Sequence, residues 1–142
     1  MSRQKPSKEM ESVLNLSGPE RYAYFVRRVV EQQVAWGLRS EEGWVLVGFD
    51  GQGSDAFCIW PDVVYTQACA AEGWNDCEPE PIPLQELMEE MIPSLLADEL
   101  RLAVFPTPAG QAVVVDPRDL QAHLEAEIEH ALTHQGHQEG RS

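Results

Sequence analysis

Four histidines near the carboxyl end of the chain form the first pattern whose residue types and spacing could do chemistry. On one continuous helix they would share a face with a glutamate, and imidazole and carboxylate groups are ligands for metals such as zinc or nickel. The group consists of His123, Glu127, His130, His134 and His137. The last two histidines, however, fall in a glycine- and glutamine-rich stretch that offers no rigid frame to orient their rings. We therefore expect no metal site and no cofactor, with metal binding by these histidines as the open alternative.

No other pattern specifies a catalytic mechanism. The 24 Asp and Glu residues are spread so widely that no pair stands out as a general acid and base. Ser54 and Ser94 lack the G-x-S-x-G setting of a nucleophilic serine, no G-x-x-x-x-G-K-[ST] loop occurs, and the glycines at 48, 51 and 53 indicate a turn. Hydrolase, nucleoside-triphosphatase and dehydrogenase functions lose support. We expect no catalytic residues and favour a protein that is not an enzyme.

The cysteines indicate a reducing compartment. Cys58, Cys69 and Cys77 are odd in number and form no C-x-x-C pair. The first two have apolar neighbours and are expected to be small buried side chains. Acidic neighbours of Cys77 disfavour its thiolate, so we predict no cysteine nucleophile.

Charge is distributed unevenly along this chain, whose net charge is −14. Residues 1–39 hold seven basic against four acidic residues, whereas the remainder holds three against twenty. A surface this acidic repels phosphate backbones and anionic lipids, so we expect neither nucleic acid nor a membrane as a partner, except through the short basic segment at the start of the chain. A basic protein is the expected partner, and the alternative is that the acidity serves only solubility.

Six carboxylates in the middle of the chain form the candidate contact for such a partner. They are Asp76, Glu78, Glu80, Glu86, Glu89 and Glu90. The leading hypothesis is a non-enzymatic protein-binding module with a regulatory or immunity-like role. The alternative is a small-molecule-binding domain, or a minor enzyme, with a pocket near Trp60 and Trp74. Aromatic residues on strands belong more often to a core, and Trp74, in a loop, is the one expected to be partly exposed.

Length and composition indicate one soluble domain. The chain has 142 residues, of which 43% are hydrophobic, and no apolar run approaches the roughly 20 residues that span a bilayer. Its first residues lack the apolar segment of a secretory signal, so we expect a cytoplasmic protein of a bacterial type. The expected organisation is a disordered leader at 1–16, a single domain at 17–133 and a flexible tail at 134–142.

The first half of the chain predicts one helix, three strands and a second helix. Ser17 and Glu20 form a capping box at the start of the first helix. The residues of its apolar face, expected to be buried, are Tyr22, Phe25, Val26, Val29 and Val30. Its arginines, Arg21, Arg27 and Arg28, lie on the other face and are expected in water. Antiparallel strands are expected around 36–38, 44–47 and 57–60, with a turn at 50–53. Asp62 can cap a helix that holds Val63 and Val64 and ends at Gly73.

The second half predicts a loop, a helix, a hairpin and a final helix. Three prolines among acids make 76–83 a loop, because proline cannot pair in a sheet interior. An apolar stripe from Leu84 to Leu95 indicates a helix that Pro93 kinks or restarts. A hairpin pairs 100–105 with 111–115, and the last helix starts at Pro117 and frays past Thr133. The order α-β-β-β-α-α-β-β-α predicts an α+β fold, with an antiparallel or mixed sheet of about five strands and helices packed on it.

Several short motifs occur in a recognisable order. They are Glu20-Arg21-Tyr22, Trp36-Gly37-Leu38, Gly43-Trp44-Val45-Leu46, Trp60-Pro61, Pro93-x-Leu95, Val104-Phe105-Pro106-Thr107-Pro108 with Gly110, and Asp116-Pro117. Over about residues 19–132 the sequence resembles an uncharacterised bacterial family known as a domain of unknown function. The resemblance implies a small cytosolic single-domain protein and brings no activity or catalytic residue with it.

Overall fold

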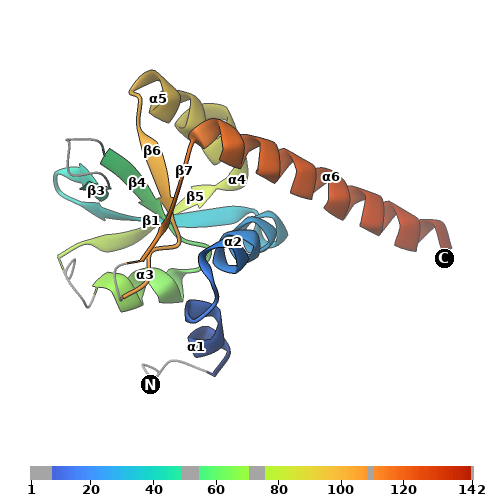
Figure 1. Cartoon of the computed structure of the whole chain (residues 1–142). Coiled ribbons are helices and arrows are strands. Elements are labelled where there is room, and N and C mark those ends of the chain that lie inside the picture. The colour runs from blue at the N-terminus through green and yellow to red at the C-terminus, as the bar shows by residue number, and fades with distance from the viewer. Residues whose placement is uncertain (1–7, 49–54, 71–75, 109–110, 142) are drawn as a thin grey trace.

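The structure, a computed structural model, describes residues 8–48, 55–70, 76–108 and 111–141, with side chains as far as residue 133. Figure 1 shows strands gathered at the centre, helices around them and a last helix that extends away from the body. The fold is α+β, as the order of the predicted elements indicates. Within the described residues, no helix is both long and apolar enough to cross a membrane.

Seven strands in the described part of the chain form two sheets. They are β1 (Val34–Ser40), β2 (Gly43–Trp44), β3 (Leu46–Gly48), β4 (Asp55–Ile59), β5 (Glu78–Pro83), β6 (Arg101–Val104) and β7 (Val113–Val115). One sheet has the order β2-β1-β5 and the other β3-β4-β6-β7, with β4 and β6 parallel. Backbone hydrogen bonds of 2.8 and 2.9 Å between Trp36 and Trp60 link the two sheets. The mixed pairing confirms the prediction, while the number of strands exceeds the expected one.

Strand β5 corrects the prediction that residues 76–83 form a loop. It pairs with β1 at the edge of its sheet, where Glu80 lies opposite Gly37 and Pro81 opposite Trp36. Trp36 directs its N–H and C=O to Trp60, away from β5. Because hydrogen-bonded and non-hydrogen-bonded pairs alternate along an antiparallel ladder, the bonds from β1 to β5 come from the residues on either side of Trp36. The prolines alternate along β5 and therefore all place their missing N–H on the outer edge. Proline excludes a segment from a sheet interior, but not from this position.

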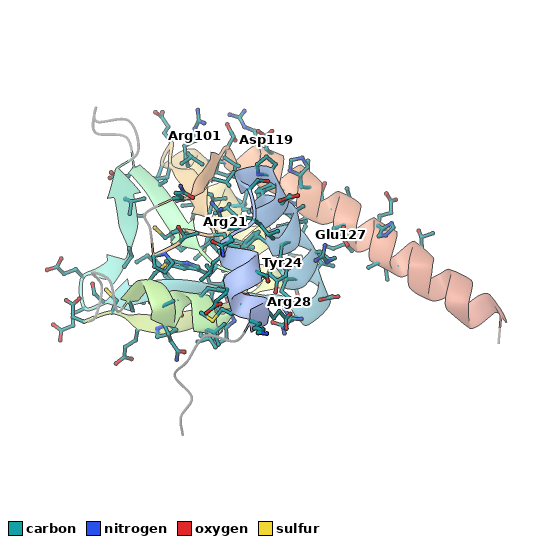
Figure 2. All side chains as sticks on the ribbon, turned by 60° about the horizontal axis from the view of Figure 1, so that its bottom comes forward. Arg21, Tyr24, Arg28, Arg101, Asp119 and Glu127 are labelled. Atoms are coloured by element: carbon teal, nitrogen blue, oxygen red, sulfur yellow. The ribbon has the colours of Figure 1, made fainter. Side chains whose placement is uncertain are left out.

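Helix α2 (Gly18–Gln32) begins as predicted and buries Phe25, Val26, Val29 and Val30. The capping box is present, with hydrogen bonds of 3.2 Å in both directions between Ser17 and Glu20. The expectation that Arg21 lies in water is wrong, because its side chain is only 2% exposed. Arg21 Nε donates to the carbonyl of Phe105 (3.2 Å) and Nη1 to that of Leu16 (3.0 Å). Figure 2 shows Arg21 among the side chains at the centre of the molecule.

The apolar stripe from Leu84 forms one helical segment with an irregular middle. It consists of α4 (Leu84–Glu86), the π-helical turn η1 (Leu87–Met91) and α5 (Ile92–Ala97). The N–H of Ile92 donates to the carbonyl of Leu87, which is the spacing of a π turn. Pro93 follows directly, and proline in a helix lacks an N–H and crowds the carbonyl four residues before it. The wider turn accommodates Pro93, so the expected kink takes this form.

The remaining helices differ from the predicted ones in number and in extent. Helix α1 (Lys8–Leu14) lies within the segment expected as a disordered leader, and its Val13 is buried. Helix α3 (Val63–Ala70) buries Tyr65, Thr66 and Cys69 and leaves Val64 44% exposed. Helix α6 (Pro117–Arg141) continues past Thr133. The turn expected at 50–53 and the helix end expected at Gly73 lie outside the described residues.

Candidate functional site

A groove opens where α6 crosses the segment formed by α4 and η1, next to the end of α2. Its volume is about 370 Å³. The lining residues are Gln33, Leu84, Gln85, Met88, Glu89, Gln121, Glu125 and Ile128. They come from three helical elements far apart in the sequence, which the core holds together through buried residues such as Leu87, Leu120 and Leu124.

The end of α2 fixes one corner of the groove. Gln33 adopts the left-handed conformation (φ 65°) that terminates a helix, and its N–H donates to the carbonyl of Val29 (2.7 Å). Its own carbonyl accepts from the N–H of Leu84 (3.0 Å), which joins the end of α2 to the start of α4. The backbone therefore holds Gln33 and Leu84 side by side at the groove.

Two glutamine–glutamate pairs, one on each helical wall, supply most of the polar lining. Gln85 Nε2 donates to the carboxylate of Glu89 (3.4 and 3.5 Å), and Gln121 Nε2 donates to Oε2 of Glu125 (2.8 Å). Both pairs have the spacing of four residues at which helical side chains meet. Gln33 Nε2 also turns to an internal acceptor, the carbonyl of Val30 (2.9 Å).

The groove lining combines negative charge with apolar side chains. Glu89 and Glu125 line it with Met88 and Ile128, and no Lys, Arg or His belongs to its lining. In the part of the chain that the structure describes, neither carboxylate forms a salt bridge with a basic side chain. Such a surface attracts cationic groups and offers apolar contact to whatever carries them.

The six carboxylates of the predicted strip lie on more than one element. Glu78 and Glu80 lie on β5, and Glu80 pairs with Arg39 at 3.7 Å. Asp76 precedes β5, where it accepts a hydrogen bond from the thiol of Cys77 (3.7 Å). Glu86 and Glu90 lie on the helical segment outside the groove lining, so Glu89 is the strip residue that the groove includes.

Trp60 occupies the core rather than an open pocket. Its side chain is fully buried, and its Nε1 donates to the carbonyl of Pro106 (2.9 Å), which also accepts from Cys69 Sγ (3.2 Å). Trp74 lies outside the described residues. Burial raises the pKa of the Cys58 thiol to about 12, and burial together with Asp76 raises the pKa of Cys77; both shifts disfavour the thiolate form.

The histidines enter the described structure through α6. His123 Nδ1 lies 2.6 Å from the Tyr22 hydroxyl, and the two rings meet edge to face. Burial, with the charge of Asp119, raises the pKa of Tyr22 to about 12. No group of three or more His, Cys, Asp or Glu side chains among the described residues is arranged to hold a metal ion. The side chains of His134 and His137 lie outside the described part.

Four polar residues of the groove were not predicted as site residues from the sequence, namely Gln33, Gln85, Gln121 and Glu125. A detectable signal existed, because the pattern Q-x-x-x-E occurs at 85–89 and again at 121–125. The pattern predicts a hydrogen-bonded pair on each helix. It does not predict that the two helices face each other.

Comparison with known proteins identifies a family for most of the chain. A family model described as "Protein of unknown function (DUF2750)" matches residues 22–124. The match begins within α2 and ends within α6, and it includes the seven strands, α3, α4, η1 and α5. No curated protein matches the chain.

Proposed function

The chain belongs to the DUF2750 family of proteins of unknown function, and we propose that it is a non-enzymatic module that binds a basic segment of another protein. A regulatory or immunity-like role fits such a module. The groove between α6 and the α4–η1 segment is the contact site. The observation that carries this function is a lining that combines apolar side chains with two carboxylates, Glu89 and Glu125, which form no salt bridge among the described residues.

The charge of both helical walls supports this assignment. Residues 84–100 contain no Lys, Arg or His, and they include Glu86, Glu89 and Glu90. Along α6 as far as residue 133, the one Lys or Arg is Arg118, whereas the acidic residues are Asp119, Glu125, Glu127 and Glu129. A second copy of the chain would bring like charges together at this surface, whereas a basic partner would neutralise them.

Apolar exposure beside these charges argues for an interface in addition to solubility. Leu132 is 63% exposed on α6, one helical turn beyond Ile128 of the groove. A partner that lays an apolar stripe along α6 and basic groups toward Glu89 and Glu125 would cover both features. Acidity that served only solubility would not require leucine and isoleucine at this position.

The proposal is tested with a partner isolated by crosslinking from the native host and then produced in pure form. Its affinity should fall at least about tenfold as salt rises from about 50 mM to about 500 mM, because screening removes the attraction between exposed charges. The double variant Glu89→Gln with Glu125→Gln should weaken binding and flatten this salt dependence. The matched double variant Glu86→Gln with Glu90→Gln removes the same charge outside the groove and should have a smaller effect. Equal affinity at low and high salt would contradict the proposal.

A further inference from the structure

The groove has an excess of hydrogen-bond acceptors over donors. Three glutamines line it, and each directs its amide nitrogen to an acceptor within the protein: Gln33 to Val30, Gln85 to Glu89 and Gln121 to Glu125. The carboxylates are acceptors as well. The groups that remain available to a ligand in the groove are therefore mainly oxygen acceptors.

One of these oxygens is buried and has no partner. Gln121 Oε1 forms no hydrogen bond, although the atom is hidden from solvent. It is the only such side-chain atom among the described residues. Buried polar atoms are almost always satisfied, since an unmade hydrogen bond destabilises the folded state. Gln121 belongs to the groove lining, so a ligand that brings a donor and displaces the atoms covering this oxygen would satisfy it.

We propose that the groove binds the guanidinium group of an arginine side chain. Guanidinium is a planar cation with five N–H donors and no acceptor, which complements the carboxylates of Glu89 and Glu125 on two walls and the amide oxygen of Gln121 on the α6 wall. Met88 and Ile128 offer apolar contact to the aliphatic part of the side chain. The volume of about 370 Å³ lies toward the small end of ligand pockets, which hold roughly 300–1,000 Å³.

Arginine fits better than the other cations that such a groove attracts. The lysine ammonium has three donors on one atom and cannot span both walls as a fork. Calcium requires about six to eight oxygen ligands, and no group of three or more candidate ligands is assembled in the described structure. This assignment rests on the proposed function, because it takes the arginine from a partner protein.

Binding is measured on the full chain with three capped amino acids: N-acetyl-arginine, N-acetyl-lysine and N-acetyl-citrulline N-methylamides. Citrulline has nearly the shape of arginine without its charge. In amide-resolved NMR titrations, the arginine probe should shift the side-chain signals of Gln85 and Gln121. It should bind at least about tenfold more tightly than the citrulline probe, because paired charged hydrogen bonds are the strong ones. Equal shifts from lysine or citrulline, or larger shifts from calcium chloride alone, would overturn the guanidinium assignment.

Variants separate recognition from folding. Gln121→Leu should weaken the arginine probe at least about fivefold. It removes the buried acceptor that has no partner together with the exposed hydrogen bond from Nε2 to Glu125, so it should leave the free energy of unfolding nearly unchanged. Glu89→Gln with Glu125→Gln should abolish detectable binding, and Glu86→Gln with Glu90→Gln should preserve it. A Gln121→Leu protein that binds the probe with unchanged affinity would contradict the role of this acceptor.

The source of the guanidinium is tested with free L-arginine and with an arginine-containing peptide from the crosslinked partner. Tighter binding of the peptide supports the partner as the source. Equal binding of both would retain the guanidinium site and overturn its assignment to a protein partner. If no guanidinium enters the groove while a basic partner still binds in a salt-dependent manner, this inference fails and the proposed function stands.

Discussion

Arg21 shows how one buried side chain organises the loop after β6. Its guanidinium donates to the carbonyls of Leu16 and Phe105 and lies 6.0 Å from the Phe105 ring. Phe105 has a positive φ of 57°, a conformation that favours glycine, and yet it is fully buried. Its N–H donates to the carbonyl of Ile59 (2.7 Å). Hydrogen bonds at both ends of the residue thus hold an uncommon backbone in place.

Arg21→Met should destabilise the protein by about 2–4 kcal/mol, because it leaves two carbonyls without their donor. Chemical denaturation measures the change in the free energy of unfolding. Arg27→Met, on the exposed face of the same helix, is the matched control and should change it by less than about 1 kcal/mol, the usual worth of an exposed cation–aromatic contact. Similar losses from both variants would show that the buried hydrogen bonds contribute little.

Glu99 carries strain that a substitution can remove. It is exposed, has a φ of 60°, and follows α5 at a position where glycine is common. Glu99→Gly should raise the free energy of unfolding by about 1 kcal/mol. Asp98 has a φ of −90°, so Asp98→Gly gains nothing from the new freedom and should lower stability. A loss of stability in Glu99→Gly, measured by thermal and chemical unfolding, would contradict this account.

At this scale the sequence predicts which helix face is buried but not every residue on it. The spacing of Phe25, Val26 and Val29 identifies the core face of α2. Arg21 lies on the same face, and its charge led to the expectation that it would be exposed. What reverses that expectation is the pair of carbonyls at Leu16 and Phe105, and the second of these is 84 residues away.

At the scale of the element, the alternation of prolines along β5 determines which of its residues can donate a hydrogen bond to β1. Residues 78, 80 and 82 face β1 with their N–H groups, and residues 79, 81 and 83 do not. Glu80→Pro should therefore break the ladder and cost about 1–3 kcal/mol, because it removes a ladder hydrogen bond and leaves its acceptor on β1 without a donor. Glu80→Ala removes the carboxylate and retains the N–H, and Pro81→Ala restores an N–H on the outer edge. Both controls should change the unfolding free energy by less than about 1 kcal/mol, and a comparable cost for all three would mean that the register is different.

The starts of the helices could be predicted from the sequence, but the pairing of strand β5 and the π turn could not. Capping signals at Ser17 and Asp116 and the apolar stripes predict α2 and α6 at their starts. The pairing of β5 depends on β1, which lies about 40 residues earlier in the chain, and composition alone does not reveal it. The π turn η1 likewise follows from Pro93 only once α4 and α5 are known to be continuous.

The groove exists only at the scale of the whole molecule. Gln33, Glu89 and Gln121 meet there because the core fixes α2, η1 and α6 against one another. The acidity of the second half of the chain was predictable from the sequence, and it motivated a basic partner. Which carboxylates share a surface was not predictable, since this depends on helix packing rather than on distance along the chain.

Weak acids in the interior set the response of the whole molecule to alkaline pH. Burial raises the pKa of Cys58 from 9.0 to about 12 and, with Asp119, that of Tyr22 from 10.0 to about 12. Burial and a hydrogen bond with Tyr24 also raise the pKa of Tyr65. The unfolded chain loses these protons near the ordinary values, whereas the folded chain retains them to higher pH. Their contribution to stability is therefore present below about pH 9 and is lost as pH rises toward 12.

The free energy of unfolding should accordingly decrease steadily from about pH 9 to pH 11, as urea denaturation at constant ionic strength would show. Tyr22→Phe should make this decrease shallower above about pH 10, because one of the three groups no longer titrates. The substitution also removes the hydroxyl that meets His123, so its cost at pH 8 serves as the baseline. Absorbance at 295 nm should show fewer phenolates in the folded protein than in urea at pH 11. Equal phenolate content in both states, together with stability that is constant up to pH 11, would show that these side chains are as accessible to water as in the unfolded chain.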